Sequence, residues 1–315
     1  MEDAYSACTL CPRMCRVDRR AGRGFCGMGA VCLVARAALH LWEEPCISGT
    51  RGSGAVFFSG CNLRCAFCQN RPVSHEGYGL AVTPERLADI FRELVDAGAH
   101  NIDLITATPF IPTVLRALDL YTPPVPVVWN SGGYERADVL RLLSGRVQVY
   151  LPDLKHVSSR LSGLCAGAPD YFASAAPALL EMRRQTGENV YDENGLLLRG
   201  MVVRHLLLPG CTADAMRVMD FVAENLPGVP VSIMRQYTPQ PFCTVPGLNR
   251  RITDAEYDRV TAHALALGLT GYFQEKSSAD REYTPPFDGT GVLSPAPIPD
   301  RRDAPEPAEN GGTHV

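Results

Sequence analysis

Three cysteines in the first quarter of the chain have a spacing that suits an iron–sulfur cluster. Cys61, Cys65 and Cys68 form a C-x3-C-x2-C run, and Phe67 directly precedes the last of them. Clusters are usually held by four thiolates, so a set of three leaves one iron of a [4Fe-4S] cluster open to an outside ligand. Two other interpretations are a structural zinc site completed by Cys46 or His75, and cysteines that pack as small apolar residues.

A second group of cysteines precedes the first. Cys8, Cys11, Cys15 and Cys26 form a C-x2-C-x3-C-x10-C run with several glycines around it. Four thiolates suit either a tetrahedral zinc ion or a second [4Fe-4S] cluster. The remaining alternative is a set of free thiols in an irregular segment. The acidic start of the chain lacks the apolar run of a signal peptide. Clustered cysteines without such a signal favour metal over disulfides, and the cytoplasm as compartment.

The elements that must position these cysteines follow an alternating pattern. Short apolar stretches predict strands over 55–59, 102–106, 125–129, 147–151, 201–208 and 231–234, with a further strand over 270–273. One predicted helix begins at Pro84, after the N-cap Thr83, and closes at Gly98; others span about 111–120, 136–143, 171–186, 213–225 and 254–267. This alternation predicts an α/β fold with a parallel sheet, either a partial barrel or an open sheet. Catalytic groups then gather at the carboxyl ends of the strands.

The stretch around the three cysteines carries a resemblance to a known family. Residues 57–70 read FFSGCNLRCAFCQN, which resembles the signature of the radical S-adenosylmethionine (SAM) superfamily. Within it the stretch is similar to proteins related to pyruvate formate-lyase-activating enzyme, on the branch with an N-terminal Cys-Pro-Arg-x-Cys element, here residues 11–15. The likeness runs from about Cys8 to about Pro239. It implies a partial (β/α)6 barrel of the radical SAM type.

The chain divides into three parts on this interpretation. Residues 1–50 are a small Cys-rich metal-binding segment, and residues 51–284 are the partial barrel. Residues 285–315 are rich in proline and glycine and are predicted to be a disordered tail.

The resemblance also implies cofactors and a reaction. A [4Fe-4S] cluster on Cys61, Cys65 and Cys68 cleaves SAM reductively, and the resulting 5′-deoxyadenosyl radical abstracts hydrogen from a substrate that the sequence does not identify. The activating-enzyme branch makes a glycine on a glycyl-radical enzyme one candidate substrate. An electron donor such as flavodoxin or ferredoxin is implied as a partner.

Several residues match the family's cofactor-binding positions. The resemblance assigns SAM or its surroundings to Phe67, Asn130, Ser131, Asp153, Lys155 and Arg204. Two of these also attract notice on their own: Lys155 is one of only two lysines, and Arg204 is a charge within an apolar strand that must find a polar partner. One departure is clear, because Thr106-Ala107-Thr108-Pro109 stands where the family usually has Gly-Gly-Glu.

Charge and hydropathy exclude two other classes of function. The 315 residues carry a net charge of −4, which gives no case for nucleic-acid binding. No stretch reaches the roughly 18 apolar residues that a membrane span needs. The competing function is a non-catalytic iron–sulfur or zinc module for redox or interaction on an α/β scaffold.

Overall fold

The computed structural model describes residues 2–274 and 285–296. Its strands are β1 (Cys32–His40), β2 (Ser53–Phe58), β3 (Leu80–Val82), β4 (Ile102–Ile105), β5 (Val127–Ser131), β6 (Val149–Pro152), β7 (Val190–Tyr191), β8 (Leu197–Met201), β9 (Val203–Leu206), β10 (Val231–Met234) and β11 (Gly271–Phe273). Its α-helices are α1 (Pro45–Ser48), α2 (Arg71–Ser74), α3 (Pro84–Asp96), α4 (Ile111–Leu120), α5 (Ala137–Leu140), α6 (Ser159–Ala166), α7 (Tyr171–Thr186), α8 (Thr212–Asn225) and α9 (Asp254–Ala266). Three 3-10 turns complete the described elements: Glu2–Tyr5, Thr108–Phe110 and Arg141–Leu143.

The strands form two sheets that meet at one point. The larger sheet has the order β3-β1-β2-β4-β5-β6-β8-β7, and the smaller has the order β11-β10-β9. A parallel bridge between Asp153 and Arg204 connects β6 to β9. β2, β4, β5, β6, β9 and β10 therefore follow one another in chain order as parallel neighbours. This confirms the α/β class with a mostly parallel sheet, whereas closure into a partial barrel stays a prediction.

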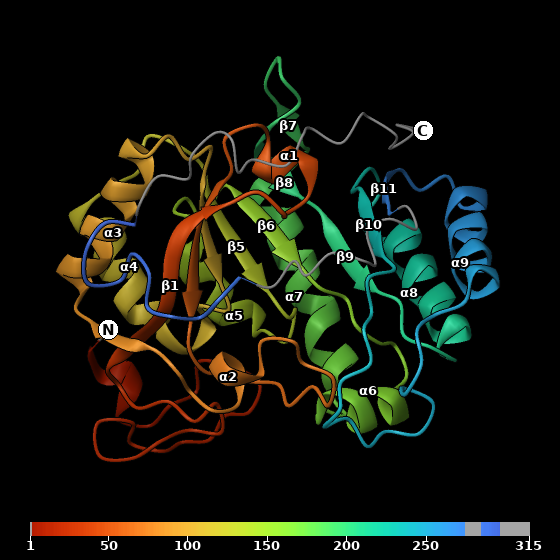
Figure 1. Ribbon diagram of the computed structural model, residues 1–315, viewed down its shortest axis with the longest axis horizontal. Helices are drawn as coiled ribbons and strands as arrows, with labels where there is room; N and C mark the ends of the chain where they lie inside the picture. Colours follow the sequence, from red (N-terminus) through yellow and green to blue (C-terminus); the bar gives the residue numbers. More distant parts are fainter. Residues whose placement is uncertain (1, 275–284, 297–315) are drawn as a thin grey trace.

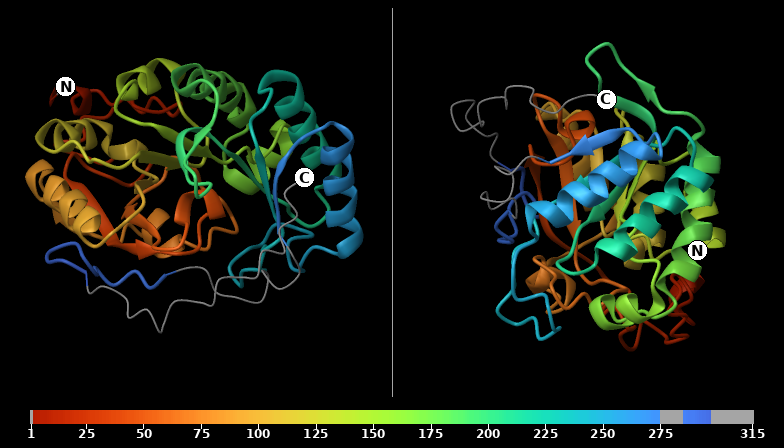
Figure 2. Two further views of the ribbon diagram at one scale, coloured as in Figure 1. Left: turned by 90° about the horizontal axis from the view of Figure 1, so that it is seen from above. Right: turned by 90° about the vertical axis from the view of Figure 1, so that its right-hand side faces the viewer.

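Helices cover one side of this sheet, as the view from above in Figure 2 shows. Helix α3 illustrates why they form where the sequence predicts them. The Thr83 side chain accepts a hydrogen bond from the backbone N–H of Arg86, and Leu87, Phe91 and Leu94 recur at helical spacing and are buried. Such an apolar stripe stabilises a helix mainly through packing against the sheet. Figure 1 shows α3 and α4 flanking the β1 side of the sheet and α8 and α9 flanking the β10 side.

The predicted strand over 201–208 is wrong in one respect, because two strands occupy this region. β8 pairs with β6 and forms a hairpin with β7, whereas β9 pairs with β10. The change of sheet falls at Val202, just after Gly200, which has a φ of +143° that L side chains rarely adopt. The hairpin and this change of direction have no signal in the apolar pattern.

The predicted domain boundaries also need correction. β1 lies within the segment 1–50, yet it pairs antiparallel with β2 and so belongs to the sheet. Residues 285–296 were predicted to be disordered, but they lie along β1 (Figure 2). The Gly289 N–H donates to the Ala35 carbonyl, the Ala37 N–H donates to the Thr290 carbonyl, and Val292 is fully buried. These contacts order a segment whose composition alone favours disorder. The predicted disorder of 297–315 lies outside the described residues.

Candidate radical SAM site

The loop over residues 60–68, called the cluster loop below, follows β2 and carries the three predicted ligands. Two backbone hydrogen bonds tie it to the end of α6, from the Arg64 N–H to the Ala166 carbonyl (2.9 Å) and from the Ala66 N–H to the Cys165 carbonyl (2.8 Å). The Asn62 side chain adds a third bond, to the Tyr134 carbonyl (2.6 Å). The loop is therefore fixed by neighbouring elements rather than by its own short turns.

Gly60 turns the chain from β2 into this loop. Its φ is +79°, and an added Cβ would lie 2.3 Å from Met28 Cγ and 2.8 Å from the Cys26 carbonyl oxygen. Any side chain here would meet both a strained backbone and the segment that precedes β1. The glycine thus allows close packing between the cluster loop and the chain's N-terminal part.

The three thiols of the cluster loop differ in their contacts. The Leu63 N–H donates to Cys61 Sγ (3.4 Å), and Cys68 Sγ lies 3.2 Å from the Ser74 hydroxyl. Cys65 is buried, and none of the three forms a disulfide. Burial raises the pKa of Cys61 and Cys65 to about 12, which favours the protonated form of both thiols. Metal binding would displace these protons, as it does at thiolate sites in general.

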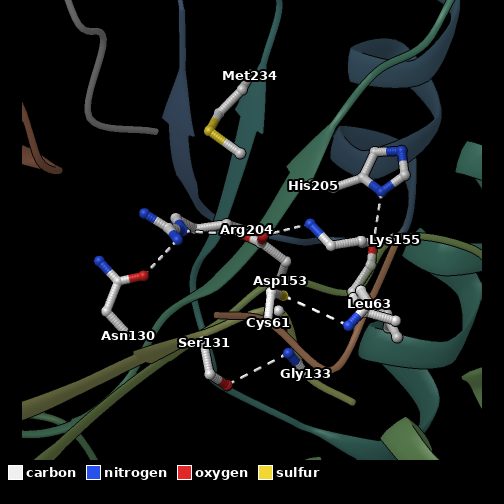
Figure 3. A network of polar contacts seen from close by, with 12 residues as sticks. Cys61, Leu63, Asn130, Ser131, Gly133, Asp153, Lys155, Arg204, His205 and Met234 are labelled. Atoms are coloured by element: carbon white, nitrogen blue, oxygen red, sulfur yellow. Dashed lines mark hydrogen bonds and ion pairs between the residues drawn. The ribbon is translucent and has the colours of Figure 1, made fainter. Parts of the chain in front are cut away.

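Three of the predicted SAM residues form one network of ion pairs beside the loop (Figure 3). Arg204 Nε donates to Asp153 Oδ1 (3.0 Å), and Lys155 Nζ donates to Asp153 Oδ2 (2.6 Å). Burial opposes the charges of all three groups. Their mutual attraction prevails, so the pKa of Asp153 is held below its usual range and the pKa values of both cations are raised. The three side chains, which the sequence predicted to lie at one edge of the sheet, are in direct contact in the structure.

Asn130 joins the same network. Its Oδ1 accepts from Arg204 Nη2 (2.6 Å), and its Nδ2 donates to Asp103 Oδ2 (3.2 Å). Glu43 accepts from Arg204 Nη1 (2.9 Å). Arg204 thus contacts three side chains from three elements, with five N–H groups available in its planar fork.

The remaining predicted residues lie close by but in other environments. Phe67 is buried edge-on to Tyr237, with ring centroids 5.9 Å apart. Ser131 Oγ accepts from the Gly133 N–H (3.2 Å) and so shapes the turn after β5. His205 points away from the network, as strand alternation predicts. Its Nδ1 lies 2.7 Å from the Leu154 carbonyl oxygen, and burial lowers its pKa to about 4, which fits a structural role.

The turn that replaces Gly-Gly-Glu has an unusual backbone. Thr106 has a φ of +61° although it is not a glycine, and its N–H donates to the Asn130 carbonyl (2.8 Å). The Thr108 hydroxyl donates to Glu135 Oε1 (2.5 Å), and burial raises the pKa of Glu135 to about 7. A buried acid therefore does stand beside this turn, but it comes from the loop after β5.

Sequence reasoning missed Glu43, Glu44, Asp103 and Glu135. Asp103 lies within the apolar strand β4, so it carries the same signal that drew notice to Arg204, a charge where a charge must be paired. Glu43 and Glu44 had only the weaker signal of two adjacent acids before a proline. Burial raises the pKa of Glu43, Glu44 and Asp103, and repulsion by neighbouring carboxylates adds to the effect.

Comparison with known families decides what this arrangement is. Residues 55–193 match the model of the radical SAM superfamily. This stretch is a radical SAM domain. It contains the cluster loop, the turn at 106–109 and the pair Asp153 and Lys155, while Arg204 lies beyond its end. The superfamily implies a [4Fe-4S] cluster, SAM and SAM-dependent radical chemistry of a general oxidoreductase type.

Similar proteins are known from sequence and from structure. An uncharacterized protein of Methanocaldococcus jannaschii is 28% identical over 273 residues, which cover 82% of this chain and 74% of that protein. SuiB of Streptococcus suis, solved with bound SAM, is 15% identical with a TM-score of 0.44, over 65% of this chain and 44% of SuiB. The hydrogenase maturase HydG of Carboxydothermus hydrogenoformans is 10% identical with a TM-score of 0.47, over 75% of this chain and 54% of HydG. The chain thus spans less than two thirds of these solved structures.

The donors around the radical SAM domain fit the cofactors that it implies. Cys61, Cys65 and Cys68 supply three sulfur ligands on one loop, which leaves one cluster iron for an outside ligand. Lys155 lies near Cys61 and Cys65, Asp153 links it to Arg204, and both cations have donor groups beyond those already engaged. The individual roles of these side chains toward SAM stay predictions.

The segment over residues 8–26, called the N-terminal cysteine segment below, packs against the radical SAM domain. Two of its four predicted ligands lie close to each other, since Gly24 has Cys15 Sγ and Cys26 Sγ each 3.6 Å from its Cβ position. Burial raises the pKa of Cys11 to about 12, and Glu135, Cys15 and Cys26 raise it further. Across ranges 2–274 and 285–296, no three His, Cys, Asp or Glu side chains are arranged to hold a single metal ion. Zinc or a second cluster at this segment stays a prediction.

Within the described residues, no helix combines the length and the apolar character that crossing a membrane requires. The predicted cytoplasmic location is not tested by this finding.

Proposed function

We propose that the chain is an enzyme that holds a [4Fe-4S] cluster on Cys61, Cys65 and Cys68 and uses SAM to abstract hydrogen from a substrate. When bound, the cluster and SAM supply one-electron cleavage of a carbon–sulfur bond, which yields methionine and a 5′-deoxyadenosyl radical. The observation that carries this proposal is the partly buried network of Asp153, Lys155 and Arg204 beside a loop with three thiols. A purely structural metal site would have no use for two partly buried cations at this place.

The chain's own residues would position the cofactor and keep water away. Lys155 and Arg204 are held rigidly by Asp153, so their remaining donors point in fixed directions for a carboxylate. Lys155 also lies near enough to Cys65 to favour its thiolate form, although burial of that thiol is the larger effect. Asn130 orients the Arg204 fork from the opposite side.

The finer proposal concerns the substrate and partners. The likeness to activating-enzyme relatives supports a glycine on a glycyl-radical enzyme as the group attacked, with a flavodoxin or ferredoxin as electron donor. These roles rest on the resemblance of the cluster loop and of the Cys-Pro-Arg-x-Cys element.

The test is SAM cleavage by anaerobically reconstituted protein. With dithionite and SAM, the wild-type chain is expected to be brown and to release methionine and 5′-deoxyadenosine. Cys65→Ala should lower this release by about a thousandfold or more, because one of three cluster ligands is lost. The matched control is Cys211→Ala, a half-buried cysteine at the start of α8 that should change little. A colourless, zinc-loaded and inert wild type would contradict the proposal, and an active Cys65→Ala would refute the ligand assignment.

A further inference from the structure

A cavity of about 230 Å³ lies between the cluster loop and the link from β1 to α1. Gln69 and Asn70, directly after the last cluster-loop cysteine, line one side of it, and Glu43 and Glu44 line another. Ligand cavities for drug-sized molecules span about 300–1,000 Å³, so this one suits a small group or one end of a larger molecule. Because Gln69 and Asn70 directly follow the cluster loop, the cavity is a candidate binding place for the group that reacts.

The walls of the cavity carry more negative than positive charge. Arg204 is the one arginine or lysine among its described lining residues, and it already pairs with Glu43 (2.9 Å) and with Asp153 (3.0 Å). Burial and Arg36 lower the pKa of His40 to about 4, so this lining residue is neutral near pH 7. Arg204 attracts Glu44 as well, so one cation is shared by Asp153, Glu43 and Glu44, and Glu44 has no cation of its own among the described lining residues.

Glu44 also has an unused hydrogen-bonding atom. Its residue is 8% exposed, and its Oε2 has no hydrogen-bond partner among the described residues. Asp103, immediately behind the network, likewise has a buried Oδ1 without a partner in the same ranges. A buried carboxyl oxygen without a partner is costly and needs an explanation. A donor on a bound ligand supplies one.

The other lining groups suit a cation with an apolar body. Trp42 and Tyr272 are aromatic, and Met234 is a pliable apolar side chain that lies close to Arg204 in Figure 3. Aromatic faces attract ammonium and guanidinium groups. Amide side chains, among them Gln236 and Gln274, add neutral donors and acceptors.

We propose that this cavity binds the substrate through a positively charged N–H donor, an alkylammonium or guanidinium group, that pairs with Glu44. The cation binding itself stands on the cavity and its unpaired oxygen. Only the identification of the bound molecule as the substrate rests on the function proposed above. The charged group comes either from a free amine or from a lysine or arginine side chain of a peptide.

The experiment measures binding to the reconstituted full chain by isothermal titration calorimetry, first without SAM and then with SAM present at saturation. The free probes are n-butylammonium and butylguanidinium, with n-butanol and butyrate as neutral and anionic counterparts. The peptide probes are Gly-Lys-Gly and Gly-Gln-Gly. Both cationic classes are expected to bind more tightly than their neutral counterparts by about tenfold or more, as charge-assisted hydrogen bonds do. The tighter of butylammonium and Gly-Lys-Gly identifies the source of the cation.

The variant that tests the contact is Glu44→Gln, which keeps the shape and removes the charge. It should abolish the preference for cations and leave the affinity for n-butanol unchanged. Glu188→Gln, an exposed residue after α7, is the matched control and should keep the preference. Thermal unfolding checks that both variants fold. If Glu44→Gln does not fold, the ranking of the probes on the wild-type chain still tests whether the cavity prefers cations.

Several results would overturn the inference or separate it from the proposed function. Equal binding of n-butanol and n-butylammonium, or a cation preference that survives in Glu44→Gln, overturns it. Displacement of the amines by SAM also overturns it, because the cavity then belongs to the cofactor. If amines bind while the chain fails to cleave SAM, the proposed function fails and the cation site remains. If SAM is cleaved and no amine binds, only the cavity inference fails.

Discussion

The cluster loop and the N-terminal cysteine segment lie against each other, but different parts of the fold hold them in place. Regular elements fix the cluster loop, which follows β2 and bonds to the end of α6 through its backbone. Arginines fix the N-terminal segment. Arg19 is buried and donates to the carbonyls of Met28, Pro109 and Gly29, and Arg13 donates to those of Asn62 and Gly167.

This difference bears on what each region can do. The cluster loop meets Lys155, which Asp153 links to Arg204, and these two partly buried cations suit an anionic group of a cofactor. The N-terminal segment has Glu135 near Cys11 instead, and its buried arginine is engaged by carbonyl oxygens. The first region is therefore equipped for a charged ligand beside a metal centre, and the second is equipped for a closed metal site or for packing alone.

The largest expected effect is on metal content and SAM cleavage when one cysteine of either region is replaced. Cys15→Ser should remove the metal bound at the N-terminal segment and leave 5′-deoxyadenosine formation within about threefold of wild type, because a closed structural site contributes folding energy rather than chemistry. Cys65→Ser should do the reverse. Iron and zinc analysis of both variants, together with the SAM cleavage assay, measures this. Loss of SAM cleavage in a well-folded Cys15→Ser would show that the two regions act as one site.

A second prediction concerns the contact between the regions. Gly60→Ala should destabilise the protein by about 3 kcal/mol, since the added Cβ meets both a positive φ and the atoms of Met28 and Cys26. Gly145→Ala is the matched control, with a φ of +76° and no described heavy atom within 4 Å of its Cβ position. It should cost only about 1 kcal/mol, the price of the backbone conformation. Chemical denaturation of both variants measures the difference, and equal losses would show that the contact at Gly60 contributes nothing.

The sequence predicts the positions that regular structure controls. Helix α7 spans the predicted residues 171–186, and Arg204 was predicted from being a charge in an apolar strand and from the family resemblance. Asp153 and Lys155 follow the same logic, because parallel strands bring their carboxyl ends together. These features depend on local periodicity and on a rule of topology, both of which are readable along the chain.

The features that escaped prediction depend on contacts between distant residues. Glu44 reaches the cavity because β1 joins the sheet next to β2, and residues 285–296 are ordered because β1 offers them backbone partners. The sequence gives little indication that β1 is a strand, because the irregularity in register between Val34 and Arg36 interrupts the alternation of apolar and polar residues. A polar group whose partner is far away in sequence gives no local sign of what it pairs with.

The smallest expected effect tests whether arginine geometry holds the N-terminal segment. Arg13 donates through Nε to the Asn62 carbonyl and through Nη2 to the Gly167 carbonyl, both at 2.8 Å, and its guanidinium lies 3.9 Å from the centre of the Phe25 ring. Lysine keeps the charge but cannot reproduce two bonds in a plane, so Arg13→Lys should cost about 1 kcal/mol.

The loss should appear as local opening rather than as uniform weakening. Amide hydrogen exchange is therefore expected to increase in the N-terminal segment of Arg13→Lys while the strands around β5 stay protected. Arg92→Lys, in which an exposed guanidinium on α3 bonds Asp89 of the same helix, is the control and should leave exchange in that segment unchanged. If Arg13→Lys exchanges like the wild type, the segment is held by its cysteines or by a metal on them. The claim that arginines hold the N-terminal cysteine segment is then wrong.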